Sequence, residues 1–166
     1  MVRPGVRLGV DVGSVRVGLA ASDPAGIFAT PVATLARDTT DGHTDVVRIA
    51  ETAREVDAVE IVVGLPRLLS GAEGEAARLA RAYALDLAAA VAPVPVRLVD
   101  ERLTTVDAHR RLRESGVAGR SQRDVVDQTA AVLILQSALD GERASGRAPG
   151  SRVGPQRRRP RAKDRG

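Results

Sequence analysis

The chain has 166 residues, 43% of them hydrophobic, which suits one domain with a single buried core. It contains no Cys, so it can form neither a disulfide framework nor a thiolate metal site. With one Phe, one Tyr and no Trp, it also lacks the aromatic platforms on which RRM and OB domains stack bases. The core must therefore be built from Val, Leu, Ile and Ala.

Two segments bear on membrane insertion and secretion. The first seven residues lack the unbroken apolar core of a signal peptide. The most apolar later stretch, residues 85–96, contains Asp86, Pro93 and Pro95 and is too short to span a bilayer. We expect a cytoplasmic protein that does not insert into membranes.

Positive charge is concentrated at the carboxyl-terminal end. Residues 143–166 contain nine Lys or Arg and one acid, whereas residues 1–142 contain 16 basic and 20 acidic residues. The Arg-rich end is broken by Gly and Pro and cannot bury enough apolar surface to fold alone. We predict a globular domain over 1–142 and a basic, disordered tail over 143–166, either a solvated end or an arm that binds nucleic acid phosphates.

The chain opens with strand-like runs and continues with alternating helices and strands. Expected strands cover 6–12, 17–22 and about 27–35, then 59–64 and 94–99. Expected helices cover 44–55, about 71–92, 105–115 and 121–139. This order predicts an α/β fold in which helices flank a mixed five-stranded sheet, with an antiparallel meander on one side and parallel strands on the other. RNase H-like folds use the same order.

Asp11 is a candidate catalytic acid because of its place in the first strand. The apolar residues of this strand alternate to one face, which puts Asp11 on the other, with Gly9 and Gly13 nearby. We expect these glycines to leave room for a charged group, since an unpaired buried carboxylate would cost several kcal/mol, on the order of the penalty for a desolvated ion. The alternative is that Asp11 caps the following turn.

Two acids, Asp100 and Glu101, follow the last predicted strand. If this strand is parallel to its neighbours, the acids emerge at its carboxyl end, where open α/β sheets keep their sites. Alternation sends them to opposite faces, so only one can point at a site that contains Asp11. Arg102 could instead simply neutralise both acids, and the segment alone is weak support for a site.

Asp127 lies on the apolar face of the last predicted helix. At about 100° per residue, it falls in the middle of the face formed by residues 130, 131, 134 and 138. Asp124, by contrast, completes a capping-box pattern and is explained structurally. A carboxylate on an apolar face must be hydrogen-bonded, paired or metal-bound, so we expect a metal there or, alternatively, a buried Arg.

Asp11, Asp127 and an acid after the 94–99 strand together would make a site of oxygen ligands for Mg²⁺ or Mn²⁺. His43 and His109 are single residues outside any metal-binding or catalytic motif. Two such ions about 4 Å apart can activate a water and stabilise the leaving oxygen of a phosphodiester. The residues therefore indicate metal-dependent phosphodiester hydrolysis.

Five short motifs, in this order, resemble those of the YqgF family of bacterial proteins. They are GVDVGSVRVG at 9–18, ASD at 21–23, VGLP at 63–66, DERLTT at 100–105 and VDQTAA at 126–131. The resemblance covers about residues 6–139 and leaves the tail outside. It implies an RNase H-like fold related to Holliday-junction resolvases, a cytoplasmic location, and a nuclease role in maturing the 5′ end of the 16S ribosomal RNA precursor.

The resemblance also implies which residues form the site. The catalytic, metal-binding acids would be Asp11, Glu101 and Asp127. The residues that position a phosphate would be Arg16, Arg102, Thr104 and Thr105. One departure is visible at 67–70, where related sequences commonly have an Asn-containing polar stretch.

Three other functions compete with this interpretation. A resolvase would cut four-way DNA and would act as a symmetric dimer. Actin-like ATPases and sugar kinases share the start of this pattern, but they close two such domains around ATP and this chain has room for one. A non-catalytic RNA-binding assembly factor would use the basic tail. We expect a monomer or homodimer that binds nucleic acid, precursor rRNA rather than branched DNA, with ribosomal assembly particles as further partners.

Overall fold

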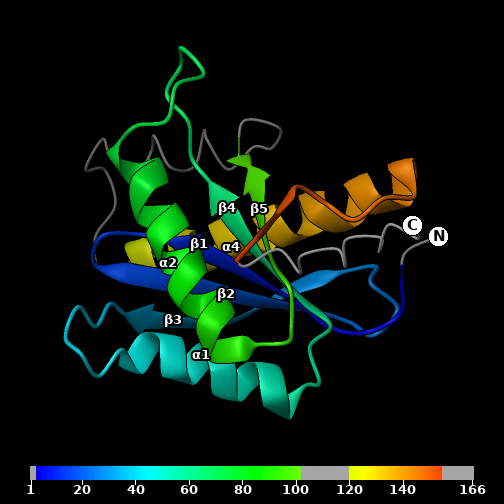
Figure 1. Ribbon diagram of the computed structural model, residues 1–166, viewed down its shortest axis with the longest axis horizontal. Helices are drawn as coiled ribbons and strands as arrows, with labels where there is room; N and C mark the ends of the chain where they lie inside the picture. The colour runs from blue at the N-terminus through cyan, green and yellow to red at the C-terminus, as the bar shows by residue number, and fades with distance from the viewer. Residues whose placement is uncertain (1–2, 102–119, 155–166) are drawn as a thin grey trace, which may run out of the picture.

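The chain folds around a six-stranded mixed sheet (Figure 1). A computed structural model describes residues 3–101 and 120–154, with only the backbone for 120–129. The strands lie in the order β3-β2-β1-β4-β5-β6. Their bounds are β1 Arg7–Val12, β2 Arg16–Ser22, β3 Ala29–Ala36, β4 Glu60–Leu65, β5 Val96–Asp100 and β6 Ser151–Val153. The helices are α1 Thr44–Glu55, α2 Glu75–Val91 and α4 Arg120–Ser145. The helix expected near 105–115 lies outside the described residues.

The pairing of the strands confirms the expected mixture of antiparallel and parallel neighbours. β1 pairs with β2, and β2 with β3, in antiparallel register. β1 and β4, and β4 and β5, are parallel. The carboxyl ends of β1, β4 and β5 therefore lie at one edge of the sheet, which we call the carboxyl edge, marked by Val12, Leu65 and Asp100.

Helices cover both faces of the sheet (Figure 1). On the α1/α2 face, β-strand residues such as Leu8, Val10 and Ile61 share one core with apolar residues of both helices. On the α4 face, a second core joins the strands to α4. Its buried members are Ala20, Val62, Val99, Ala130, Ala131, Ile134, Leu135, Ala138 and Leu139. β1 is consequently buried along its whole length.

Gly9 allows α4 to pack closely against β1. A Cβ at Gly9 would lie 2.6 Å from the Cβ of Leu135 and 2.9 Å from the carbonyl oxygen of Ala131. At Gly13 a Cβ would lie 2.8 Å from the carbonyl oxygen of Arg16, so this glycine serves the β1–β2 hairpin. The expectation that both glycines leave room for a charged group is therefore wrong: one accommodates a helix and the other a turn.

The end of the fold also differs from the expected five strands and a tail from residue 143. α4 continues to Ser145, and β6 pairs antiparallel with β5, with Ser151 opposite Leu98 and Val153 opposite Val96. A strand of three residues between two glycines is too short to show an alternating pattern, and only its pairing with β5 defines it. Residues 155–166 lie outside the described part of the chain.

An ion cluster around two buried acids, Glu60 and Glu142, ties α4 to the opposite, amino edge of the sheet. Arg3 Nε lies 2.7 Å from Glu142 Oε1, and Arg3 Nη2 lies 2.9 Å from Glu60 Oε2. Arg97 Nε lies 3.0 Å from the same Glu60 oxygen, and Arg7 Nη2 lies 3.8 Å from Glu142 Oε2. The start of β1 and the end of α4 are thereby joined. No helix in the two described ranges is long and apolar enough to cross a membrane.

Candidate active site

Asp11 lies near the carboxyl end of β1 and is 1% exposed. It is opposite Gly18 of β2 in the antiparallel register. Because side chains two residues apart share a face, Asp11 lies on the same face as Gly9, which is the α4 face. A carboxylate buried at this point needs a hydrogen-bonded or cationic neighbour.

Glu101 directly follows β5 and is 2% exposed. A Cβ at Gly64 of β4 would lie 2.5 Å from Glu101 Oε1 and 2.5 Å from Ile134 Cδ1 of α4. The Glu101 carboxylate therefore lies against β4 on the α4 face, in space that only a glycine leaves open. This role of Gly64 was not predicted from the sequence, although a glycine inside a buried strand is a known sign of close approach.

Asp11 and Glu101 lie at the same part of the carboxyl edge, at the ends of the two strands that flank β4. The parallel register pairs Val10 with Val63, and the next residues along these two strands are Asp11 and Gly64. The Glu101 carboxylate, which lies against Gly64, is therefore beside Asp11 on the same face of the sheet. Two buried carboxylates that are 90 residues apart in sequence are brought to one place by the β1–β4–β5 pairing.

Asp100 has a different environment from Glu101. It pairs through Oδ2 with Arg67 Nε at 3.3 Å. Arg67 also donates from Nη1 to the carbonyl oxygen of Gly71 at 3.2 Å, so it ties the loop after β4 to the end of β5. The predicted alternation is confirmed, and of the two acids Glu101 is the one that shares a face with Asp11.

Arg16 opens β2 on the other side of the hairpin from Asp11. Residues two apart in a strand share a face, so Arg16 lies on the same face as Gly18 and Ala20. Because Ala20 packs against α4, this is the α4 face. The N–H of Gly13 donates to the carbonyl oxygen of Arg16 at 2.9 Å, which closes the hairpin beside the acids. Arg16 is thus placed on the same face and at the same edge of the sheet as the two acids.

The remaining predicted site residues lie wholly or partly outside the described structure. Asp127 is within α4, but its side chain is not among those described. Arg102, Thr104 and Thr105 fall in 102–119, outside the described residues. Among the described side chains, which do not include that of Asp127, no three or more potential metal ligands form a group.

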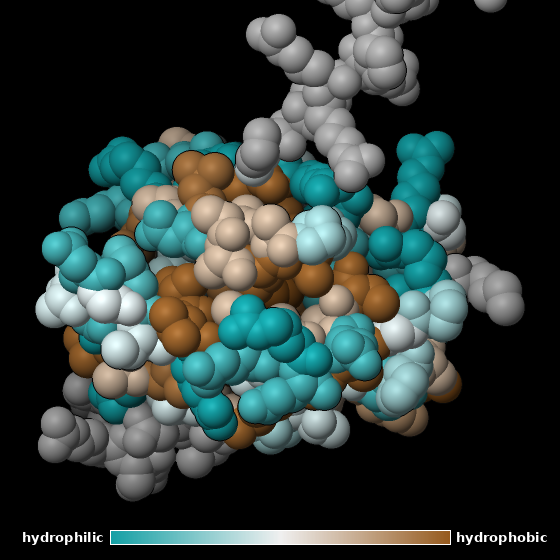
Figure 2. Space-filling model, turned by 60° about the horizontal axis from the view of Figure 1, so that its bottom comes forward, coloured by the Kyte–Doolittle hydropathy of each residue, from teal (hydrophilic) through white to brown (hydrophobic). Residues whose placement is uncertain are grey.

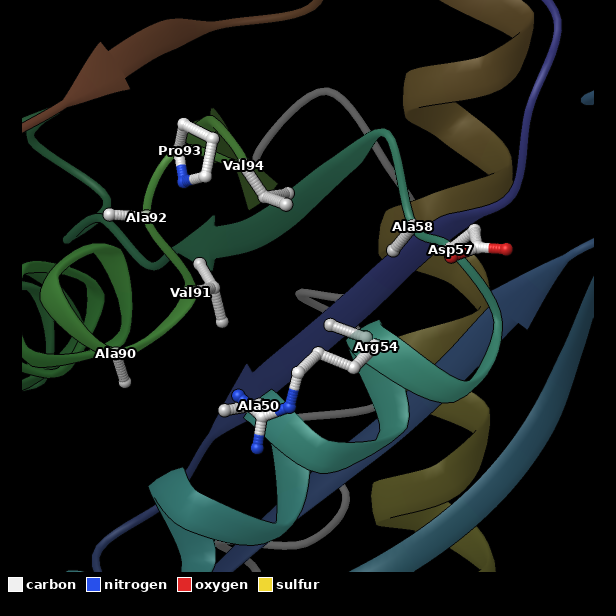
Figure 3. A pocket seen from close by; sticks show the side chains of 10 residues that line it. Ala50, Arg54, Asp57, Ala58, Ala90, Val91, Ala92, Pro93 and Val94 are labelled. Atoms are coloured by element: carbon white, nitrogen blue, oxygen red, sulfur yellow. The ribbon is translucent and has the colours of Figure 1, made fainter.

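A cavity of about 300 Å³ lies on the α1/α2 face, away from the two acids (Figure 3). Small apolar side chains line most of it, together with Arg54 and Asp57. Figure 2, in which the bottom of the Figure 1 view comes forward, shows apolar side chains gathered in the middle of that face and hydrophilic ones around them. Neither Asp11 nor Glu101 lines this cavity, so it is not the site they form.

Comparison with solved structures identifies the fold. The chain is similar to RuvC of Thermus thermophilus in complex with a Holliday junction substrate, with a TM-score of 0.53 and 16% identity over 84% of this chain and 96% of that chain. A second structure of Thermus thermophilus RuvC gives a TM-score of 0.50 and 15% identity over the same shares. The chain therefore has an RNase H-like fold, as predicted.

Sequence comparison identifies the family within that class. The family model of RuvX, described as Holliday junction resolvase, matches residues 5–141, and the chain belongs to this family. This confirms the resemblance to YqgF, the other name under which the family is known. The chain is accordingly a nuclease, an enzyme that hydrolyses phosphodiester bonds.

Two curated relatives from bacteria are similar to this chain over most of their length. A protein of Frankia casuarinae is 63% identical over 145 residues, which are 87% of this chain and 71% of that protein. One of Kineococcus radiotolerans is 57% identical over 166 residues, covering 99% of this chain and 87% of that protein. Both carry the name "Putative pre-16S rRNA nuclease".

Proposed function

We propose that this nuclease is metal-dependent and processes the 5′ end of the 16S ribosomal RNA precursor, with Asp11, Glu101 and Asp127 as its catalytic, metal-binding acids. The observation that carries the proposal is that Asp11 and Glu101, both almost fully buried, lie on one face of the carboxyl edge, with the Glu101 carboxylate against the β4 glycine that neighbours Asp11. The name shared by the relatives supports precursor rRNA as the substrate.

The direction of α4 supports Asp127 as the third acid. Glu142 of α4 lies beside Arg7 at the start of β1, and Leu135 lies against Gly9. Moving back along α4 therefore corresponds to moving forward along β1, toward Asp11. Asp127 comes two turns before Leu135, and helical spacing assigns it to the same face.

The donor set fits Mg²⁺ or Mn²⁺. Carboxylate oxygens are the ligands that these ions prefer, and buried carboxylates close to one another need a cation to offset their repulsion and desolvation. When bound, the ions would supply a water activated for attack and would neutralise the charge that develops on the phosphate. In this proposal Arg16 holds a phosphate oxygen of the substrate on the α4 face, and Arg102, Thr104 and Thr105 assist it.

Cleavage of four-way DNA junctions is the second candidate function. It is favoured by the family description and by the likeness to RuvC, which is seen with a Holliday junction. A resolvase needs two sites related by symmetry, so this function requires a homodimer, whereas rRNA processing is open to a monomer. Either substrate is nucleic acid, and the rRNA proposal implies a cytoplasmic protein that meets ribosomal assembly particles.

The proposal also redraws the domain boundary. We extend the nuclease domain past residue 142 to include β6, which ends at Val153, and place the basic arm in the residues that follow, of which 155–166 contain six Lys or Arg and one acid. In this arrangement the arm binds phosphates of the substrate.

The test compares a precursor rRNA leader with a four-way DNA junction, each with Mg²⁺, with Mn²⁺ and with a chelator. We expect cuts in the rRNA leader only when metal is present. Asp11→Asn should reduce the rate at least about 100-fold with an unchanged circular dichroism spectrum, because one acid of the metal site is lost. Asp41→Asn, an exposed acid in the loop before α1, is the control and should keep full activity. Full activity of Asp11→Asn, or cutting without metal, would contradict the mechanism, and cuts in the junction alone would favour the resolvase.

A further inference from the structure

Arg37, the residue after β3, closes the β1–β2 hairpin from the α1/α2 side. Its backbone N–H donates to the carbonyl oxygen of Val15 at 2.8 Å. Its side chain Nη1 donates to the carbonyl oxygen of Gly13 at 3.2 Å. A single residue therefore holds the hairpin at two points, one of them only two residues beyond Asp11.

The Arg37 side chain is itself held by two buried residues, Asp45 of α1 and Tyr83 of α2. Arg37 Nε lies 3.6 Å from Asp45 Oδ2, and Arg37 Cζ lies 5.0 Å from the centroid of the Tyr83 ring. The Tyr83 hydroxyl donates to the same Asp45 oxygen at 3.1 Å. We call these three residues the Arg37 cluster, and it joins the end of β3, the start of α1 and the middle of α2 beneath the hairpin.

The chemistry of the cluster favours one fixed geometry. Asp45 and Tyr83 are 3% and 4% exposed, so the guanidinium is attracted to the carboxylate and to the ring with little screening by water. Burial and the charge of Asp45 hold the pKa of Tyr83 well above its usual range, so its hydroxyl remains a donor at all ordinary pH values. The planar guanidinium can meet the carbonyl, the carboxylate and the ring at once, which a lysine ammonium cannot.

The hairpin transmits this constraint to the candidate active site. The N–H of Gly13 donates to the carbonyl oxygen of Arg16, so Gly13 and Arg16 move together. Asp11 lies in β1 two residues before Gly13, and Arg16 begins β2. A shift of Gly13 therefore displaces both groups relative to Glu101, which is fixed separately by β4 and β5.

We propose that Arg37 is a positioning residue of the nuclease, which fixes Asp11 and Arg16 by holding the hairpin between them against Asp45 and Tyr83. The inference rests on the proposed function because it assigns Asp11 to the reaction. Arg37 itself lies on the opposite side of the hairpin from the acids and acts through the backbone. A displacement of about 1 Å at a reacting group can cost about 100-fold in rate, so a small movement of the hairpin is enough to matter.

The test uses Arg37→Lys, Arg37→Ala and Tyr83→Phe, assayed on whichever nucleic acid the wild type cuts. We expect Arg37→Ala to lower kcat about 30- to 100-fold and to change KM less than about threefold, because the binding surface remains and the reacting groups shift. Arg37→Lys should recover only a small part of the rate. Tyr83→Phe keeps the ring and the volume, and should lower kcat about three- to tenfold while remaining folded.

Rescue separates positioning from general stability. Millimolar guanidinium added to Arg37→Ala should restore part of kcat, which a merely destabilised protein would not show. Arg48→Ala is the matched control, because Arg48 is an α1 surface residue whose side chain is 57% exposed and pairs only with Glu51 among its described ion pairs. Its kinetics should equal those of the wild type.

Several outcomes would overturn the inference. Wild-type kcat in folded Tyr83→Phe and Arg37→Lys would do so, as would a loss of thermal stability with kcat unchanged. If Arg37→Ala fails to fold, these two milder variants carry the test. Failure of this inference is distinguishable from failure of the proposed function, since Asp11→Asn would then remain inactive while the Arg37 variants are fully active.

Discussion

Replacing Gly64 with Ala would test the position of Glu101 without removing any functional group. The new methyl would lie 2.5 Å from both Glu101 Oε1 and Ile134 Cδ1, whereas ordinary contacts begin at 3.4 Å. Both atoms therefore have to move by about 1 Å: the Glu101 carboxylate oxygen, and Cδ1 of Ile134, which is packed in the core between α4 and the sheet. Both contacted atoms are side-chain ends, and the backbone of β4 can remain in place.

This displacement should affect catalysis far more than stability. Inserting a methylene-sized group into a packed core costs about 1–3 kcal/mol, and the lower entropy of the unfolded Ala chain returns about 0.4–1 kcal/mol. We therefore expect Gly64→Ala to lower the free energy of unfolding by about 1–2 kcal/mol. A misplacement of about 1 Å at a metal-binding acid should lower kcat about 100-fold.

The assay measures kcat and urea unfolding for Gly64→Ala beside Gly141→Ala. Gly141 lies in α4 with no atom within 4 Å of a new Cβ, so its replacement should stabilise the protein by up to about 1 kcal/mol and leave kcat unchanged. Wild-type kcat in folded Gly64→Ala would refute the reasoning, because it would mean that the reaction does not depend on where Glu101 lies.

Two further predictions concern the ion cluster at the amino edge and the basic arm. Burial raises the pKa of Glu142, but the hydrogen bond and the charge of Arg3 outweigh burial, so the pKa of Glu142 is lower in the folded protein. The ionised Glu142 therefore stabilises the fold above the unfolded pKa near 4.5, and this stabilisation is lost as pH falls through the folded pKa. Glu142→Gln should thus lower the free energy of unfolding by about 3–5 kcal/mol at pH 7, and the difference from wild type in urea unfolding should shrink below about pH 4; a difference independent of pH would contradict this. Deleting residues 155–166 should weaken nucleic acid binding, as measured by binding titrations at several salt concentrations. The slope of log affinity against log salt should become shallower by about 0.7–0.9 for each phosphate that the arm neutralises in the full chain. An unchanged slope would exclude the arm from binding.

Local patterns predicted the sheet well because they reflect local geometry. Alternation correctly put Asp11 on the face opposite the apolar residues of the first strand and sent Asp100 and Glu101 to opposite faces, and the helical crossovers correctly predicted the parallel strands. The errors concern contacts between distant segments. Nothing near Gly9 in sequence indicates that Leu135 packs on it, and nothing near Ser151 indicates that it pairs with β5.

The candidate site was predicted only in part for the same reason. The sequence alone left Asp100 and Glu101 as rivals, and the pairing of Asp100 with Arg67 depends on how the loop after β4 returns to β5. The Arg37 cluster gives no motif at all, because its three members come from three elements that meet only in the folded chain.

Tyr83 gives the Arg37 cluster a spectroscopic consequence. It is the only tyrosine in a chain without tryptophan, so the near-ultraviolet emission of the whole protein comes almost entirely from this one ring. A tyrosine hydroxyl that donates to a carboxylate fluoresces weakly, and the donation to Asp45 should keep the native protein dim. Brightening would therefore report the loss of the Tyr83–Asp45 hydrogen bond in the Arg37 cluster, in unmodified protein and without any added label.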